Sequence, residues 1–186
     1  MADDNKDKEF DDDFAHIFDD IPDEGGNRSG NDITSETENL KPRLIKEIEV
    51  KVLGVYEHTE DEPGELPLEK YFILLRDDTN RRVAIWIGKF EAYSISMAME
   101  HASLDRPMTH DLMCNVITKL GARISKILID DIWQETYYAK IAMQTPIRVI
   151  EIDSRPSDAI AVAIRANAPI FMAESVLEQS ALNNDV

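Results

Sequence analysis

Apolar and polar positions follow two different periods along the chain after residue 44. Residues 45–56 alternate apolar and charged side chains with a period of two, which predicts a strand with one solvent-facing side. Short runs rich in β-branched and aromatic residues predict further strands at 71–75, 83–87, 124–129, 136–143 and 148–152. Residues 58–68, with two prolines and a glycine among acidic residues, predict a loop.

Four segments have apolar residues spaced three and four positions apart, which predicts amphipathic helices. They are 89–101, the segment between Thr109 and Gly121, 156–167 and 174–181. Thr109 is expected to be an N-cap, and Gly121 is expected to end its helix.

The order strand-strand-strand-helix-helix therefore occurs twice. Sliding one half over the other by 67 positions superimposes Glu91 on Asp158. The matching order favours an internal duplication, with a pseudo-twofold relating residues 45–120 to 124–181. Because short turns between consecutive strands favour antiparallel pairing, the predicted class is α+β. We expect two similar β-β-β-α-α halves, with mainly antiparallel sheets packed against helices.

The first 40 residues differ from the rest in charge. They hold 14 acidic and 3 basic side chains and few aliphatic ones, which predicts a disordered, solubilising acidic tail. Four apolar residues in it have the spacing of one helix face: Phe10, Phe14, Ile17 and Phe18. Their alternative role is docking to a protein partner or back onto the domain. The folded domain is expected over 41–182, with 183–186 as a short C-terminal tail.

The single cysteine and the short apolar runs narrow the class of protein. Cys114 alone cannot form an intrachain disulfide, which favours a reducing cytoplasm. No apolar run approaches the roughly 20 residues of a membrane span, and the N-terminus is acidic rather than signal-like. We therefore expect a cytoplasmic protein that does not enter membranes, and leave homo-oligomer formation open.

Three charged motifs each stand at the start of a predicted helix: IGKFEA (87–92), RPMTHD (106–111) and IDSRPSDA (152–159). Carboxylates at a helix N-terminus are stabilised by about 0.3–1 kcal/mol, so Glu91, Asp111 and Asp158 have a simple structural interpretation. The alternative is a shared site, because carboxylates clustered with an arginine can hold a divalent metal and a phosphate. His110 is then a candidate general acid or base.

Several catalytic signatures are absent. The chain has no HExxH, CxxC or GxSxG motif and no glycine-rich phosphate loop.

Four runs carry a family resemblance: IWIGKFEA, RPMTHDL, LGARISKILIDDIWQETYYA and IEIDSRPSDAIAVAIRANAPIF. In order and spacing they resemble the bifunctional nuclease family over about residues 45–177. The resemblance implies an α+β domain of two similar halves that cleaves DNA and RNA. It also implies site residues at the motif positions. These are His110, Asp111 and Asp158 as catalytic groups, Arg106, Arg155, Thr109 and Ser157 as substrate-binding groups, and Glu91 as a metal ligand.

The resulting expectation is a nuclease that hydrolyses phosphodiester bonds of DNA or RNA with Mg²⁺ or Mn²⁺. Charge opposes general binding of duplex DNA, because residues 41–186 carry 23 acidic and 17 basic side chains. A bound divalent ion would reverse the local sign. The alternative is a non-catalytic regulatory or small-anion-binding protein that uses the same Arg/Asp cleft. Replacing Asp158 distinguishes the two, since only a nuclease loses cleavage.

Overall fold

The computed structural model describes residues 45–60, 68–102 and 104–182. The predicted acidic tail, its apolar helix face and the residues 183–186 lie outside these ranges, as do residues 61–67 of the predicted loop. The remaining ends of that predicted loop are strand, because the flanking strands reach residues 60 and 68.

Within the described residues the chain forms seven strands and four helices. The strands are β1 (Glu47–Glu60), β2 (Leu68–Asp77), β3 (Arg82–Ile87), β4 (Arg123–Trp133), β5 (Thr136–Gln144), β6 (Val149–Ser154) and β7 (Ile170–Ala173). The helices are α2 (Lys89–Met99), α3 (Thr109–Lys119), α4 (Pro156–Ala166) and α5 (Glu174–Ser180). Every predicted strand and helix is present, and the α+β class is confirmed.

The strands form one sheet in the order β3-β2-β1-β7-β4-β5-β6. Neighbouring strands are antiparallel except β4 and β7, which are parallel. Since β1 is antiparallel to β7 and β7 is parallel to β4, the meanders β1-β2-β3 and β4-β5-β6 run in opposite directions. A twofold axis perpendicular to the sheet would relate them in this way.

Strand β7 corrects the predicted order of the second half. The sequence predicts only a break at Pro169, but the next four residues are a strand between α4 and α5. The second half is therefore β-β-β-α-β-α. Elsewhere the shift of 67 positions holds closely, because adding it to the bounds of β3 and α2 gives those of β6 and α4. The duplication itself stays a prediction.

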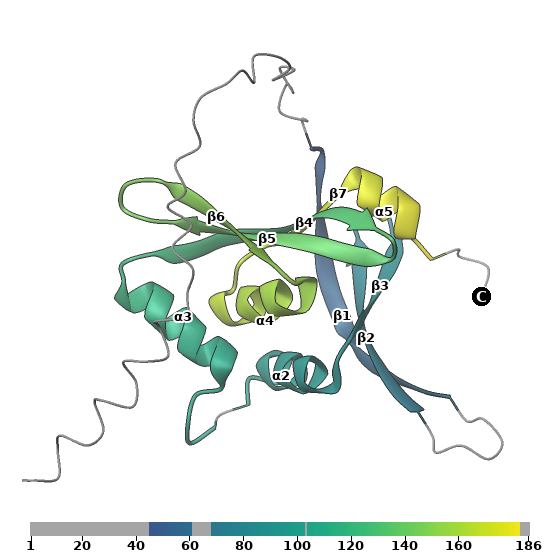
Figure 1. Ribbon diagram of the computed structural model, residues 1–186, viewed down its shortest axis with the longest axis horizontal. Coiled ribbons are helices and arrows are strands. Elements are labelled where there is room, and N and C mark those ends of the chain that lie inside the picture. Colours follow the sequence, from purple (N-terminus) through teal and green to yellow (C-terminus); the bar gives the residue numbers. More distant parts are fainter. Residues whose placement is uncertain (1–44, 61–67, 103, 183–186) are drawn as a thin grey trace, which may run out of the picture. The chain divides into compact units, whose positions relative to one another are not determined.

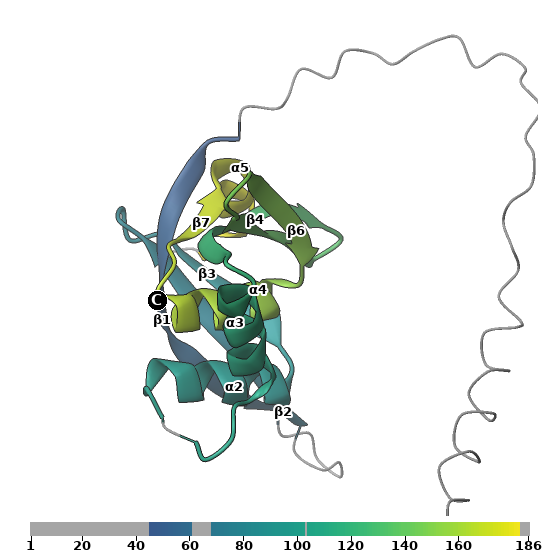
Figure 2. The same cartoon turned by 90° about the vertical axis from the view of Figure 1, so that its left-hand side faces the viewer.

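Helix α4 lies at the centre of the packing. It packs against both α2 and α3 on one side of the sheet (Figures 1 and 2). Its residues 159–163 are all fully buried, because the sheet and the two flanking helices cover different sides of it. Among the described residues, no helix has the length and apolar content needed to cross a membrane.

The start of α3 differs from the predicted cap. Thr109 is the first helical residue, and the N-cap is Met108, whose backbone is extended. The Asp111 carboxylate accepts a hydrogen bond from the Met108 N–H at 2.9 Å. The acid in the first turn therefore pairs with the backbone N–H of the N-cap residue. Gly121 ends this helix with a left-handed φ of 75°, as predicted.

Candidate active site

The helices after β3 and β6 bring two of the charged motifs together. Glu91 is the third residue of α2 and Asp158 is the third residue of α4, as the 67-residue shift requires. Arg155, the N-cap of α4, lies between them. Its Nη1 is 3.0 Å from Glu91 Oε1, and its Nε is 2.8 Å from Asp158 Oδ2.

The N-cap of α2 makes room for this arrangement. Gly88 occupies the position that corresponds to Arg155 under the same shift. A Cβ on Gly88 would collide with the carboxylate of Glu91, which folds back against the glycine. The absence of a side chain at Gly88 therefore allows the Glu91 carboxylate to lie against the start of α2. The equivalent position at the start of α4 is Arg155.

Arg155 binds Asp158 with two arms of its guanidinium, because Nη2 also donates to Oδ1 at 3.1 Å. Hydrogen bonds to Asp158, together with its charge, raise the pKa of Arg155 further. The side chain is 66% exposed. With Nη1 on Glu91, two of its five N–H groups have no partner among the described residues and are available to an anion.

His110 links α3 to both other helices. Its Nε2 lies 3.2 Å from Asp158 Oδ1, and its Nδ1 lies 2.8 Å from the Ser94 hydroxyl. An ionised carboxylate only accepts, so Nε2 carries a proton. The buried Ser94 hydroxyl donates to Nδ1 in the neutral ring, and accepts from it in the imidazolium.

Asp158 is ionised at neutral pH. Its burial alone would raise the pKa of the carboxyl, but hydrogen bonds from Arg155 and His110 and the charge of Arg155 bring it below the ordinary value. The carboxylate therefore fixes the orientation of the imidazole by accepting a hydrogen bond from Nε2.

Asp111 points to a different partner. Its Oδ1 accepts a hydrogen bond from Arg165 Nε at 2.5 Å, and its other oxygen accepts the Met108 N–H. Burial would raise its pKa, yet hydrogen bonds from Arg165 and Met108 hold it low. It does not line the pocket of Glu91 and Asp158. The contacts give it a structural role, and its predicted catalytic role stays a prediction.

Arg165 and Ser94 were not among the predicted residues. Arg165 has only 8% of its side chain exposed and also donates to Ala161 O, Ser94 O and the Ser94 hydroxyl. A single charge in the otherwise apolar run AIAVAIRA was the signal that could have found it. Ser94 gives no such signal, because a small polar residue inside a helix fits many surroundings.

A pocket of about 250 Å³ opens over these groups. Its lining residues are Phe90, Glu91, Ser94, Met108, Thr109, His110, Arg155 and Asp158. A neighbouring pocket of about 330 Å³ shares Glu91 and Arg155 and includes Ser157, Trp86 and Tyr137. Glu91 and Arg155 therefore lie between two adjacent pockets. The predicted Arg106 is exposed ahead of α3 and lines neither of them.

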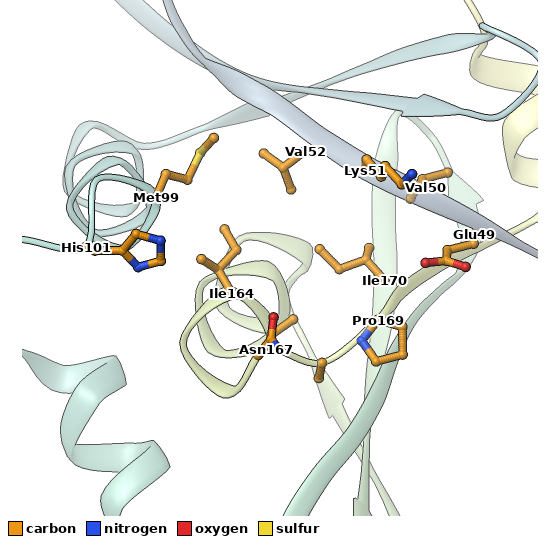
Figure 3. Close-up of a pocket in the computed structure, with 12 residues that line it drawn as sticks. Glu49, Val50, Lys51, Val52, Met99, His101, Ile164, Asn167, Pro169 and Ile170 are labelled. Atoms are coloured by element: carbon orange, nitrogen blue, oxygen red, sulfur yellow. The ribbon is translucent and has the colours of Figure 1, made fainter.

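A larger pocket of about 510 Å³ lies elsewhere, between β1 and the end of α4. Figure 3 shows Val52, Met99 and Ile164 around it, with the His101 ring at one end. It contains none of the predicted site residues. Its lining has no carboxylate–arginine pair of the kind seen over α4, so we do not assign the candidate site to it.

The donors around Arg155 do not fit a divalent metal in this arrangement. Mg²⁺ or Mn²⁺ needs several oxygen ligands, but Glu91, Asp158 and Asp111 each bind a guanidinium. Within the described parts of the chain, no group of three or more His, Cys, Asp and Glu side chains is placed to hold a metal ion.

Comparison with known proteins decides the family. The sequence profile of the bifunctional nuclease domain matches residues 73–185. The chain belongs to this family. The resemblance seen in the motifs is thereby confirmed, and the match includes the predicted residues of all three motifs.

Relatives of this bifunctional nuclease domain occur in bacteria and plants. An uncharacterised protein of Mycobacterium tuberculosis is 35% identical over 135 residues, which cover 72% of this chain and 76% of that protein. Bifunctional nuclease 2 of Arabidopsis thaliana is 22% identical over 58% of this chain, and that of Oryza sativa is 24% identical over 61%. These matches span only 34% and 36% of the two plant proteins.

Proposed function

We propose that this protein is a nuclease that hydrolyses phosphodiester bonds in the pocket of Arg155, His110 and Asp158. Membership of the bifunctional nuclease domain family supports the class of reaction. The observation that carries the proposal is the chain of contacts from Ser94 through His110 and Asp158 to Arg155, which ends at an exposed guanidinium.

Arg155 would bind the phosphate. Its two remaining N–H groups match a pair of phosphate oxygens, and its charge stabilises the negative charge that grows in the transition state. Helices α2 and α4 both begin close to this guanidinium, which contacts a residue in the first turn of each. The partial positive charge at each helix N-terminus favours binding of the phosphate as well.

His110 would act as the general acid. In the imidazolium form both ring nitrogens carry protons, with Nε2 on Asp158 and Nδ1 on the Ser94 hydroxyl. Water attacks phosphorus, the bond from phosphorus to the leaving oxygen breaks, and that oxygen takes the proton of the Ser94 hydroxyl, which lines the pocket and takes the Nδ1 proton in turn. The neutral ring then keeps its Nε2 proton on Asp158, and the Ser94 hydroxyl donates to Nδ1. The attacking water releases its proton to solvent.

The test is cleavage of single-stranded and duplex DNA and RNA by the full chain. Reactions with EDTA, Mg²⁺ or Mn²⁺ also test the predicted metal requirement. Asp158→Asn should reduce cleavage about 100-fold or more while the protein stays folded. Asp153→Asn is the matched control, because Asp153 is an exposed residue of β6 that makes no ion pair within the described residues. Full activity in folded Asp158→Asn would falsify the site.

A second candidate function is binding of a small anion without catalysis. The observation that favours it is that every carboxylate and both nitrogens of His110 already have partners, as in a structural network. Calorimetric titration with inorganic phosphate and a nucleoside monophosphate separates the two functions. Binding that needs Arg155, in a protein that cleaves none of the four nucleic acids, selects this alternative.

Cytoplasmic localisation, homo-oligomer formation and a protein partner for the acidic tail belong to the same proposal. Cell fractionation, sedimentation velocity and a pull-down with residues 1–40 test them in turn.

A further inference from the structure

The meander β1-β2-β3 has a second face, turned away from the helices. In β2, Ile73 and Leu75 are fully buried, so the residues that alternate with them lie on the other face. The same alternation holds in β3, where Val83 and Ile85 are buried. This outer face is defined by four cross-strand rows of side chains, and their composition is unusual.

One row is aromatic. Tyr56 lies directly opposite Phe72, and Phe72 lies directly opposite Trp86. The ring centroids are 5.5 Å and 5.2 Å apart, so the rings touch across all three strands. Tyr56 is 44% exposed and Trp86 is 57% exposed. The Tyr56 ring leans over Gly54, where a Cβ would press against it.

A second row is cationic. Lys51 lies opposite Arg76, and Arg76 lies opposite Arg82. All three are exposed, and none forms an ion pair with another described residue. Like charges placed directly opposite each other destabilise a sheet, so the row has a cost that folding alone does not explain.

The two remaining rows complete the surface. A row of small and apolar residues separates the cations from the aromatic rings. It consists of Gly54, Leu74 and Ala84. His58 and Lys70 pair on the other side of the rings, with the His58 ring 6.2 Å from Trp86. The rings are thus bordered by basic side chains on both sides. Glu49, two positions before Lys51, makes no ion pair with another described residue.

We propose that this face binds single-stranded nucleic acid. Unpaired bases stack on the row of Tyr56, Phe72 and Trp86, and the phosphates contact the row of Lys51, Arg76 and Arg82. The ligand class rests on the proposed function, but the binding is a separate property that is measured without cleavage. A duplex does not fit, because its bases are already stacked on one another and offer the rings no face.

Trp86 connects this face to the candidate active site. It belongs to the edge strand β3, and it also lines the pocket that contains Glu91 and Arg155. A strand laid across the rings would therefore leave the sheet next to Arg155. The outer face would position the nucleic acid, and the pocket would hold the phosphate to be attacked.

The test measures the fluorescence anisotropy of a labelled oligo(dT) or oligo(U) strand with the full chain, in EDTA and with gel analysis of strand integrity. Trp86→Ala should weaken binding about tenfold or more, because a stacked base is lost, whereas Trp86→Phe should retain most of the affinity. The matched control is Trp133→Ala, since Trp133 is the other tryptophan of the chain and is 63% exposed. It should bind as the wild type does.

Salt dependence tests the cationic row. Replacing both Arg76 and Arg82 with Gln should reduce the slope of log affinity against log salt by about 0.7 for each phosphate contact removed. Arg123→Gln, at the exposed start of β4, is the charge-matched control and should leave the slope unchanged.

Several outcomes would overturn the proposal. They are no binding of either strand by the wild type, equal affinity for duplex, and equal losses in the Trp86 and Trp133 variants. A fourth such outcome is that sedimentation shows a wild-type dimer and a Trp86→Ala monomer while the affinity for nucleic acid is unchanged. The face would then be a protein interface. Binding that depends on Trp86 without cleavage refutes only the nuclease, and cleavage that ignores Trp86 refutes only this face.

Discussion

Arg165 of α4 donates a hydrogen bond to Asp111 of α3, with its Nε 2.5 Å from Oδ1. The same guanidinium also reaches the backbone and hydroxyl of Ser94 in α2. One almost fully buried cation therefore joins three helices and contacts the same Ser94 hydroxyl as His110. The position of the imidazole depends on this support, since Ser94 contacts both Arg165 and His110.

Removing this cation should destabilise the fold. Arg165→Met leaves the Asp111 carboxylate without its partner, and we expect the free energy of unfolding to fall by about 2 kcal/mol. The value is below that of a fully buried pair because Asp111 is 35% exposed. Urea unfolding measures it, with the exposed Arg123→Met as control. Equal stability of the two variants would show that the contact between Arg165 and Asp111 does not stabilise the fold.

The pairing of Asp111 should also make stability depend on pH. Its pKa in the folded protein lies below the ordinary 3.8, so the stabilisation is present above that value and is lost as the pH falls through the folded-state pKa. The difference in thermal midpoint between wild type and Asp111→Asn should stay constant from about pH 7 to 5 and shrink below pH 3.8. A difference that persists unchanged at the lowest pH contradicts an ionic origin.

His110→Gln tests the proposed general acid. Glutamine keeps a hydrogen-bonding group but cannot deliver a proton near neutral pH, so cleavage should fall about 10²–10⁴-fold. The thermal midpoint should change little. His101→Gln provides the control for loss of an imidazole, because His101 is exposed and lines neither pocket beside Arg155. A variant that retains the wild-type rate and pH profile assigns proton transfer to another group.

Arg155→Lys should impair anion binding more than its retained charge suggests. Lysine cannot keep the two-armed contact to Asp158, reach Glu91 and present two further N–H groups at once. We expect phosphate affinity to fall about tenfold or more by calorimetry. Arg148→Lys, in the exposed turn before β6, should bind as the wild type does. Unchanged affinity in Arg155→Lys would mean that a point charge is sufficient.

Gly88→Ala isolates the role of Glu91. The backbone at Gly88 has φ −74°, which alanine adopts without strain, so the free energy of unfolding should change by less than about 1 kcal/mol. The new methyl group displaces the Glu91 carboxylate from its place beside Arg155. If Glu91 orients Arg155, phosphate affinity falls to that of Glu91→Gln. Wild-type affinity in both variants would remove Glu91 from the site.

The meeting of Glu91 with Asp158 was predictable because it follows from a repeated order of elements and a constant shift. The motifs also placed Arg155 and His110 near them. Strand β7 was missed because four apolar residues after Pro169 are too short to show a period. It is a strand only because the edges of two meanders flank it. Asp111 and Arg165 lie 54 residues apart, and no local pattern specifies that contact.

Strand β7 has a consequence for how the chain folds. Among the described strands it is the one that pairs with both meanders, joining β1 at residues 47–50 and β4 at residues 127–129. Residues 47–50 of β1 pair with residues 170–173, which are far away in the sequence. Because this pairing closes a long loop, we expect it to form late in folding. During synthesis one edge of β1 therefore stays open to unwanted pairing until residues 170–173 have left the ribosome.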